Sequence, residues 1–199
     1  MIRAIVGLGN PMSRYAFTRH NLGRMAVEAM REKIPTEWKT HFWKNYLWSA
    51  EAREPVLVLS KTYMNLSGKA VRCLAKDRSL KPEEILIVMD DCSLPLGKLR
   101  YRKSGSAGGH HGLESVLEVL GTEDVPRLRM GVGASPLNMA DFVLSEFPLE
   151  EMEDVKSMTG FLADLPEKLR TNEEKTINEI NNWRLPSEEE RAPNNEVIQ

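Results

Sequence analysis

The sequence has no long hydrophobic run and only two cysteines among its 199 residues. No apolar run approaches the roughly 20 residues that a helix needs to cross a bilayer, and the N-terminal apolar stretch is too short for a secretory signal. Cys73 and Cys92 lack the spacing of a metal site or a redox motif. These absences predict a cytoplasmic protein with reduced thiols and no membrane association.

Two glycine-rich loops lack what a nucleotide-binding loop requires. Residues 5–9 lead from an apolar run into Gly-Leu-Gly, as in a dinucleotide-binding turn, but Met12 stands where that motif has its third glycine. Residues 105–112 have no Lys-Ser or Lys-Thr pair, so they form no P-loop. The sequence therefore predicts no nucleotide cofactor.

The sequence also lacks a metal-binding pattern. No set of His, Cys and acidic residues has the spacing of metal ligands, and the adjacent side chains of His110 and His111 would point apart in any regular structure. We predict that the protein holds no metal.

The net charge of −2 hides an uneven distribution of charge along the chain. Residues 1–135 contain 21 Lys and Arg against 14 Asp and Glu, whereas residues 136–199 contain 6 against 15. The basic excess of the first part suits a polyanionic partner such as nucleic acid. An ordinary solvated surface followed by acidic helices explains the same numbers, and charge alone does not separate the two interpretations.

Short apolar runs alternate with helical patterns along most of the chain. Four segments predict strands and three carry apolar residues at helical spacing; the strands are residues 2–6, 55–60, 85–89 and 127–133, and the helices are residues 21–34, 66–75 and 113–120. Residues 42–50 predict an antiparallel strand that pairs with residues 55–60. The pattern indicates an α/β fold: three layers, with a mixed, mostly parallel central sheet and helices on both faces.

The C-terminal third is acidic and ends in a segment without periodicity. Residues 149–169 and 172–183 predict two helices that begin with acidic residues, as the helix dipole favours. Residues 185–199 contain two prolines and show no repeat of apolar residues. We therefore predict one folded domain, residues 1–184, and a mobile acidic tail, residues 185–199.

Several polar residues follow the predicted strands, where an open α/β sheet places its ligand crevice. Asn10 and Asn65 come after the first two strands, Asp90 comes directly after the third, and His110 and His111 lie in the glycine-rich loop. Each has an ordinary structural explanation as well. Asn10 before proline suits a turn, Asn65 suits a helix cap and Asp90 suits a strand end.

A histidine, a carboxylate and several amides together suit hydrolysis. His20 can take a proton from water, Asp90 can hold the imidazole in the required tautomer, and asparagine amides can stabilise an oxyanion. A lone histidine at a helix start is more often structural. Ser67 and Cys92 are possible nucleophiles, but neither sits in a nucleophile-elbow motif. Direct attack by water is therefore the favoured chemistry.

Six ordered blocks of the sequence resemble the bacterial peptidyl-tRNA hydrolase family. The blocks are GLGNP with TRHN in residues 7–23, TYMNLSGKAV at 62–71, ILIVMDD with LPLGKLRYR at 85–102, GGHHGL at 108–113, RLRMGVG at 127–133 and FVLSEF at 142–147. The resemblance implies a single α/β domain, no cofactor, and hydrolysis of the ester between a peptide and the 3′ end of tRNA. We expect the protein to be a monomer.

The resemblance also implies roles for individual residues. His20 resembles the catalytic base and Asp90 its partner, while Asn10 and Asn65 resemble amides that hold the peptide and the terminal adenosine. Tyr15 and Met64 match positions that line the same cleft. Arg102 and Arg129 match basic residues expected to clamp the tRNA 5′ phosphate, a task that suits the planar guanidinium.

The sequence departs from the family pattern at Met12, Ser60 and His111. His111 stands in the place of an active-site asparagine, where we expect it to bind substrate and to titrate together with His20. This departure favours an alternative function, an RNA-binding protein that uses the same scaffold without turnover. A third hypothesis, favoured only by the acidic C-terminal third, is a hydrolase of another acyl ester or amide.

Overall fold

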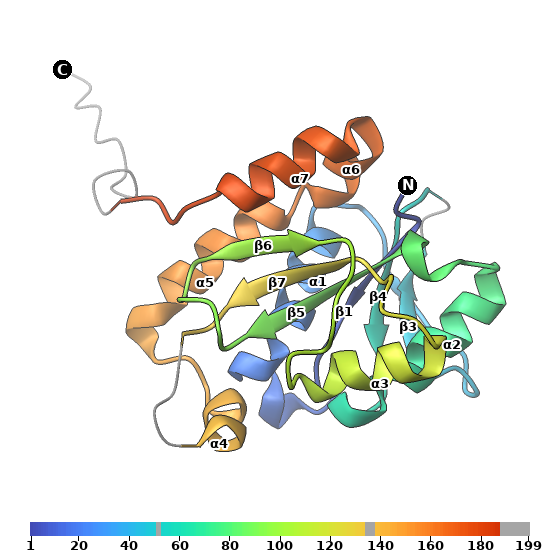
Figure 1. Ribbon diagram of the computed structural model, residues 1–199, viewed down its shortest axis with the longest axis horizontal. Coiled ribbons are helices and arrows are strands. Elements are labelled where there is room, and N and C mark those ends of the chain that lie inside the picture. Colours follow the sequence, from blue (N-terminus) through green and yellow to red (C-terminus); the bar gives the residue numbers. More distant parts are fainter. Residues whose placement is uncertain (51–52, 134–137, 188–199) are drawn as a thin grey trace.

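A seven-stranded sheet forms the centre of the computed structural model, which describes residues 1–50, 53–133 and 138–187. The strand order is β2-β3-β4-β1-β5-β7-β6 (Figure 1). The four central strands β4, β1, β5 and β7 are parallel, and the β2–β3, β3–β4 and β6–β7 pairs are antiparallel. The strands are β1 (Ala4–Gly7), β2 (Trp38–Lys39), β3 (Tyr46–Ser49), β4 (Val56–Ser60), β5 (Ile85–Asp91), β6 (Leu99–Arg102) and β7 (Arg127–Gly131).

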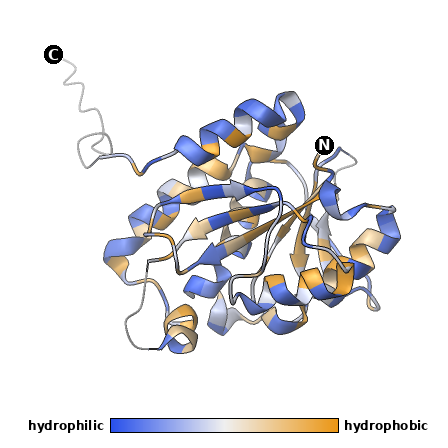
Figure 2. Ribbon diagram, in the orientation of Figure 1, coloured by the Kyte–Doolittle hydropathy of each residue, from blue (hydrophilic) through white to orange (hydrophobic). Residues whose placement is uncertain are grey.

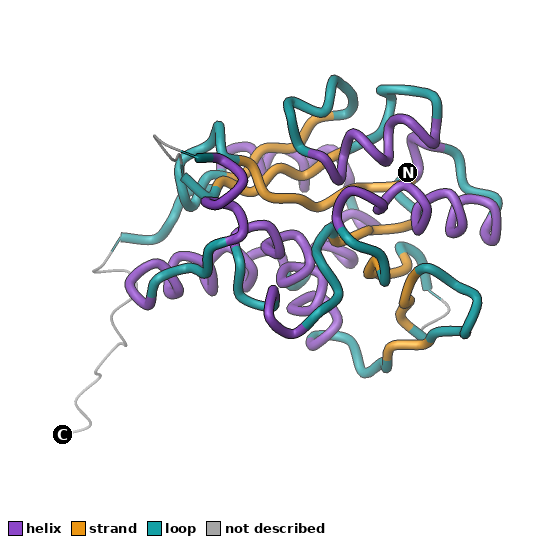
Figure 3. Tube along the Cα trace, turned by 90° about the horizontal axis from the view of Figure 1, so that it is seen from below, coloured by secondary structure: helices purple, strands orange, loops and turns teal. Residues whose placement is uncertain are grey.

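Helices cover both faces of this sheet, and Figure 3 shows them on either side of the strand layer. The α-helices are α1 (Leu22–Glu32), α2 (Ser67–Arg78), α3 (His111–Leu120), α4 (Met139–Leu144), α5 (Leu149–Leu162), α6 (Leu165–Thr171) and α7 (Glu173–Asn182). Short 3₁₀ turns that matter below are η1 (Ser13–Tyr15), η2 (Arg19–Asn21) and η3 (Met64–Leu66). The predicted α/β fold with a mixed sheet and helices on both faces is confirmed.

The alternation of side chains along the strands builds two hydrophobic cores. Ile5, Leu86 and Val88 face one side, where α1, α5, α6 and α7 pack. Val6 and Ile87 face the other side, where α2 and α3 pack. Figure 2 shows the central strands in hydrophobic colours and the helices with mixed ones. The central strands are therefore buried on both faces, which explains their continuous apolar runs.

Most elements expected from the sequence are present, including the pairing of β3 with β4. The prediction of one helix over residues 149–169 is wrong, because α5 ends at Leu162 and α6 begins at Leu165. Pro166 lies in the first turn of α6, the position where a missing backbone N–H costs least. β2, β6 and α4 were not predicted.

The described residues contain no helix long and apolar enough to cross a membrane. The predicted mobile tail, residues 185–199, falls mostly outside the described part of the chain, which ends at residue 187.

Two glycines allow α1 to lie directly against the sheet. A Cβ added at Gly23 would lie 2.2 Å from the carbonyl oxygen of Val88 in β5, and a Cβ added at Gly7 would lie 2.7 Å from the carbonyl oxygen of Gly23. Backbone atoms cannot move aside as a flexible side chain can. The position of α1, and of the turn η2 that leads into it, therefore depends on these two residues having no side chain.

We predict that Gly23→Ala lowers the free energy of unfolding by about 1–3 kcal/mol, because its methyl group overlaps the β5 backbone. The matched control is Gly160→Ala in α5, where an added Cβ has no atom within 4 Å. That substitution should stabilise the helix by roughly 0.5–1 kcal/mol. Urea unfolding of both variants measures the difference, and equal midpoints would contradict the close approach of α1.

Candidate active site

Residues from five segments, four of them polar, meet at the carboxyl edge of β1, β4 and β5. Because these strands are parallel, their carboxyl ends lie at the same edge of the sheet. Asn10 follows β1, Met64 follows β4 and Asp90 lies near the end of β5. His20 comes from η2, and His110 comes from the loop before α3. The fold thus brings together side chains that are far apart in the sequence.

The centre of this group is the buried carboxylate of Asp90. Nδ1 of His20 lies 3.0 Å from both carboxylate oxygens, and Nε2 of His110 lies 3.0 Å from Oδ1. The two imidazole rings are 4.8 Å apart between centroids. One carboxylate therefore accepts hydrogen bonds from two histidines.

The hydrogen bonds assign a tautomer to each histidine. Nδ1 of His110 accepts a bond from the backbone N–H of Leu113 at 3.1 Å, so its proton lies on Nε2, facing Asp90. His20 donates from Nδ1, which leaves its Nε2 without a proton. A neutral imidazole with a free Nε2 is the form that accepts a proton from water.

The environment of Asp90 keeps it ionised. Burial alone would raise its pKa, but the electrostatic interaction and hydrogen bond with His110, and then the hydrogen bond and electrostatic interaction with His20, outweigh burial and hold the pKa of Asp90 well below its ordinary value. The carboxylate is therefore charged throughout the neutral range. A fixed negative charge in this position can stabilise an imidazolium on the histidine to which it is hydrogen bonded.

Asn10 is held so that one end of its amide stays available. Its Oδ1 accepts a bond from the backbone N–H of Met64 at 2.9 Å. Its backbone N–H donates to Oδ1 of Asn21 at 2.7 Å, and its carbonyl accepts from Nδ2 of Asn21 at 3.0 Å. No bond is formed by Nδ2 of Asn10 within the described residues, so this donor is free to bind a carbonyl oxygen or an oxyanion.

Arg19, the residue before His20, anchors the same turn to the C-terminal part of the chain. Its guanidinium donates to Oε2 of Glu151 in α5 at 2.6 Å and lies over the rings of Phe142 and Phe147, 4.5 and 4.7 Å from their centroids. Arg19 is itself buried. Charge-assisted and cation–π contacts of this kind are stronger away from water, so the turn that carries His20 is tied to the C-terminal helices.

Three of the residues expected in the site lie outside the hydrogen-bonded group. The side chain of His111 is 75% exposed, and its Nδ1 lies 3.3 Å from Oε2 of Glu114. Asn65 is exposed in η3 and does not cap α2, which begins after Leu66 without a side-chain cap. Tyr15 is half-buried in η1 with the guanidinium of Arg14 over its ring. Their substrate-binding roles remain predictions.

His110 takes the place that the sequence suggested for His111. Two adjacent histidines at a helix start cannot both face the sheet, and the cap bond to Leu113 turns His110 inward. Its position directly before a helix, after a run of glycines, was the only signal for this role. The histidine whose ring lies beside that of His20 is therefore His110, and the expected coupling of His111 with His20 stays a prediction.

Four arginines share one face of the β6–β7 pair. Arg102 lies opposite Arg127, and Arg100 lies opposite Arg129, so all four side chains point to the same side. Arg127 is buried and donates to the carbonyl oxygen of Gly105 at 2.6 Å, which supports the glycine-rich loop. Arg129 pairs with Asp91 and Ser93, and Arg102 is exposed. Arg102 and Arg129 thus belong to a cationic face near the site.

Neither candidate nucleophile is suited to attack. Ser67, the first residue of α2, is fully buried. Burial, and then the negative charges of Asp90 and Asp91, raise the pKa of the Cys92 thiol to about 11. A protonated thiol is a poor nucleophile, which favours direct attack by water.

Among the described residues, one group could hold a metal ion, and it consists of the same three residues, His20, Asp90 and His110. One potential ligand atom each from His20, Asp90 and His110 lies within 4.8 Å of the others. Nδ1 of His20 and Nε2 of His110 each already bond to the carboxylate of Asp90. The absence of a metal in the functional protein remains a prediction from the sequence.

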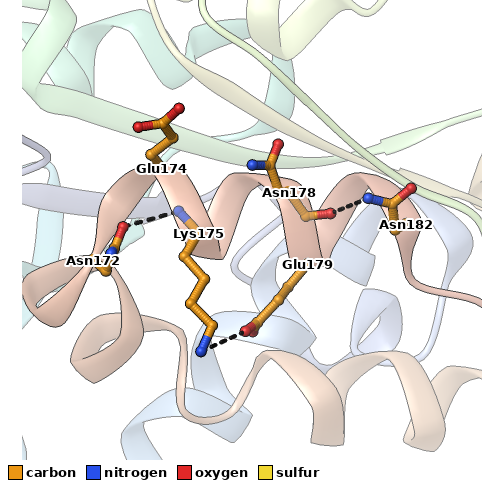
Figure 4. Close-up of a pocket in the computed structure, with 6 residues that line it drawn as sticks. All are labelled: Asn172, Glu174, Lys175, Asn178, Glu179 and Asn182. Atoms are coloured by element: carbon orange, nitrogen blue, oxygen red, sulfur yellow. Dashed lines mark hydrogen bonds and ion pairs between the residues drawn. The ribbon is translucent and has the colours of Figure 1, made fainter.

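A depression of about 470 Å³ on α7 lies away from this chemistry. Figure 4 shows that its lining side chains all come from α7 or its cap, and that several bond within the helix. Oδ1 of Asn172 caps the N–H of Lys175 at 3.0 Å, and Nδ2 of Asn182 donates to the carbonyl of Asn178 at 2.9 Å. These contacts are those of an ordinary capped helix, and they do not form a ligand-binding site.

Three comparisons with known proteins extend the motif resemblance over most of the chain. The family model described as peptidyl-tRNA hydrolase matches residues 4–189. The peptidyl-tRNA hydrolase of Thermotoga petrophila is 45% identical over 152 residues, 74% of this chain and 79% of that protein. The one from Clostridium perfringens is 36% identical over 180 residues, 89% of this chain and 96% of that protein. The crystal structure of peptidyl-tRNA hydrolase from Acinetobacter baumannii has a TM-score of 0.85 and 31% identity, covering 92% of this chain and 96% of that one.

We predict that the thiol of Cys92 reacts slowly with a thiol reagent at pH 8. A pKa of about 11 leaves it almost wholly protonated there, and its rate should rise as the pH approaches 11. A Cys73→Ala variant isolates the signal of Cys92, and the same variant in urea serves as the unfolded reference. Native and unfolded thiols reacting at equal rates at pH 8 would show that the fold does not protect this group.

Proposed function

Since this chain belongs to the peptidyl-tRNA hydrolase family, we propose that it hydrolyses the ester bond between a peptide and the 3′ end of tRNA. The family membership makes the protein a hydrolase and confirms the resemblance seen in its motifs. The observation that carries the proposal is the buried His20–Asp90 pair, together with the free amide nitrogen of Asn10. Together these groups supply a base, its charged partner and an oxyanion donor.

Nε2 of His20 accepts a proton from a water molecule as the water oxygen bonds to the ester carbonyl carbon. The carbonyl oxygen becomes an oxyanion, to which Nδ2 of Asn10 donates. Asp90 stabilises the imidazolium during this step. When the intermediate collapses, the carbon–oxygen bond to tRNA breaks and His20 returns the proton to the 3′ oxygen, releasing a free peptide and a free tRNA.

His110 positions Asp90 in this mechanism. Its hydrogen bond to Oδ1 occupies one side of the carboxylate, so rotation of Asp90 would break a buried hydrogen bond. The backbone bond from Leu113 fixes the His110 ring in turn. Asp90 is thereby held in one orientation toward His20 before substrate binds.

The cationic face of β6 and β7 is suited to the tRNA part of the substrate. Arg102 is exposed, and Arg129 presents its guanidinium beside it on the same face. Guanidinium groups bind phosphate oxygens in pairs of hydrogen bonds. We assign these two residues to the terminal phosphate of the tRNA, and the ester to the neighbouring sheet edge.

The alternative of an RNA-binding protein without turnover has little support from this arrangement. The departure that favoured it, His111, concerns a side chain that is exposed and contacts Glu114. By contrast, His20 bonds to the buried Asp90, and Asn10 is held by Asn21, the residue after His20. Incubation with labelled peptidyl-tRNA tests both functions directly. Release of free tRNA supports hydrolysis, whereas binding without release would establish the alternative.

We predict that His20→Ala lowers kcat for peptidyl-tRNA by about 10²–10⁴, because it removes the general base. Binding of tRNA should persist, since no phosphate contact is lost. The matched control is His111→Ala, a histidine with an exposed side chain, which should retain most of kcat, since a substrate-binding role of His111 would change KM instead. A His20→Ala variant with more than half of the wild-type turnover would rule out His20 as the base.

We predict that Arg102→Ala and Arg129→Ala weaken the binding of peptidyl-tRNA but leave hydrolysis of a minimal substrate nearly unchanged. The minimal substrate is a peptide ester of a short 3′ fragment, which has no 5′ phosphate to bind. Each lost phosphate contact should flatten the log–log salt dependence of tRNA binding by somewhat less than about one unit. Equal losses on both substrates would show that the arginines act elsewhere.

A further inference from the structure

An exposed group of aromatic side chains lies next to α2, at the opposite end of the sheet from the arginines. Phe42 is 97% exposed and Trp43 is 75% exposed. The ring of Trp43 stacks on the ring of His41 with centroids 5.5 Å apart and planes within 5°. The ring of His41 also lies 5.6 Å from that of Trp48 between centroids, while Trp43 and His41 are both exposed, so the stacked pair presents a flat aromatic surface to solvent.

The segment that carries these rings is held in place. The backbone N–H of Lys44 donates to the carbonyl of His41 at 3.1 Å, which closes a turn. Nζ of Lys61 donates to Oγ1 of Thr40 at 3.0 Å and to the carbonyl of His41 at 3.3 Å. The backbone N–H of Lys61 also donates to the carbonyl of Asn45 at 2.8 Å. The exposed rings thus lie on an ordered turn, so the turn loses little conformational entropy when a ligand binds.

Beside this turn, α2 presents a row of cations without partners. Lys69, Arg72 and Lys76 are spaced by three and four residues, so they share one helix face, and all three are exposed. Together with Asn45 and Cys73 they line a depression of about 430 Å³. None of the three forms an ion pair with a carboxylate in the described part of the chain.

The nearby carboxylate of Asp77 already has partners and does not neutralise these three cations. Oδ2 of Asp77 forms an ion pair with Lys44 and accepts a hydrogen bond from the hydroxyl of Tyr46 at 2.8 Å. Lys61 adds a further positive charge that is bonded only to neutral oxygens. The surface therefore combines an uncompensated positive charge with exposed flat rings.

We propose that this surface binds an RNA strand with unpaired bases. Cations on one helix face neutralise successive phosphates, and the stacked rings of His41 and Trp43 supply a platform for a base. An acidic peptide would satisfy the cations but has no flat ring to match the exposed platform. The surface is defined by His41, Phe42, Trp43, Lys61, Lys69, Arg72 and Lys76, and we call it the α2 surface.

The α2 surface is distinct from the arginines on β6 and β7. In the sheet, β3 and β6 are separated by β4, β1, β5 and β7, and the carboxyl ends of β4, β1 and β5 carry the candidate active site between them. α2 also begins directly after η3, where Met64 contacts Asn10. RNA bound on the α2 surface therefore approaches the site from the side opposite to the arginines.

The test measures binding of a fluorescent eight-nucleotide oligoadenylate, a single strand without any ester, to the full chain. A variant with Lys69→Gln, Arg72→Gln and Lys76→Gln should bind at least about 10-fold more weakly at low salt, and its log–log salt slope should fall by about 2, since each phosphate on a single strand contributes roughly 0.7. The control changes Lys156, Lys168 and Lys175 to Gln, which removes the same charge from other helices and should leave binding unchanged.

Trp43→Ala should weaken binding by about 5- to 100-fold, the range expected for loss of one stacked base, and Trp43→Phe should restore much of it. All variants should hydrolyse the minimal ester at the wild-type rate, which shows that they are folded and separates this proposal from that of the catalytic site. Wild-type affinity in the triple variant would overturn the proposal. Displacement of the RNA by polyglutamate with no effect of Trp43→Ala would overturn it in favour of an acidic peptide.

Discussion

The buried charge of Asp90 is the constraint on which the site depends. A carboxylate at the end of a central strand, out of contact with water, is tolerated only when hydrogen bonds compensate for lost hydration. His20 and His110 supply these bonds from two segments that lie 90 residues apart in sequence. The need to satisfy one buried charge therefore positions the base, fixes its tautomer and places the start of α3 against the sheet.

In the turn η2, three consecutive residues anchor the position of His20 through contacts to different parts of the chain. Arg19 binds Glu151, His20 binds Asp90 and Asn21 binds the backbone of Asn10, so each residue points to a different part of the chain. Such a turn has little freedom to rotate, because any movement that relieves one contact breaks another. The close approach of α1 through Gly23 sets the height of this turn above the sheet.

The sequence predicted those parts of the structure that follow from local patterns. Continuous apolar runs identified β1, β4 and β5, and polar residues after them identified Asn10 and Asp90. The two residues of β2, and the six of α4 without a buried side chain, leave no periodic pattern to detect. Nor could the pattern decide between His110 and His111, because the choice depends on which of two neighbours caps α3, a matter of three-dimensional packing.

The contact between α2 and α3 has a mechanical consequence. The backbone N–H of Gly68 donates to Oγ of Ser115 at 3.1 Å, and a Cβ on Gly68 would lie only 2.0 Å from the carbonyl of Ser115, so the two backbones touch. Helices in such contact cannot slide or separate without losing this packing. The exposed cations lie along α2, and α3 begins directly after His110. The cationic face of α2 and the histidine that bonds to Asp90 are therefore joined through contacting backbone rather than through flexible side chains.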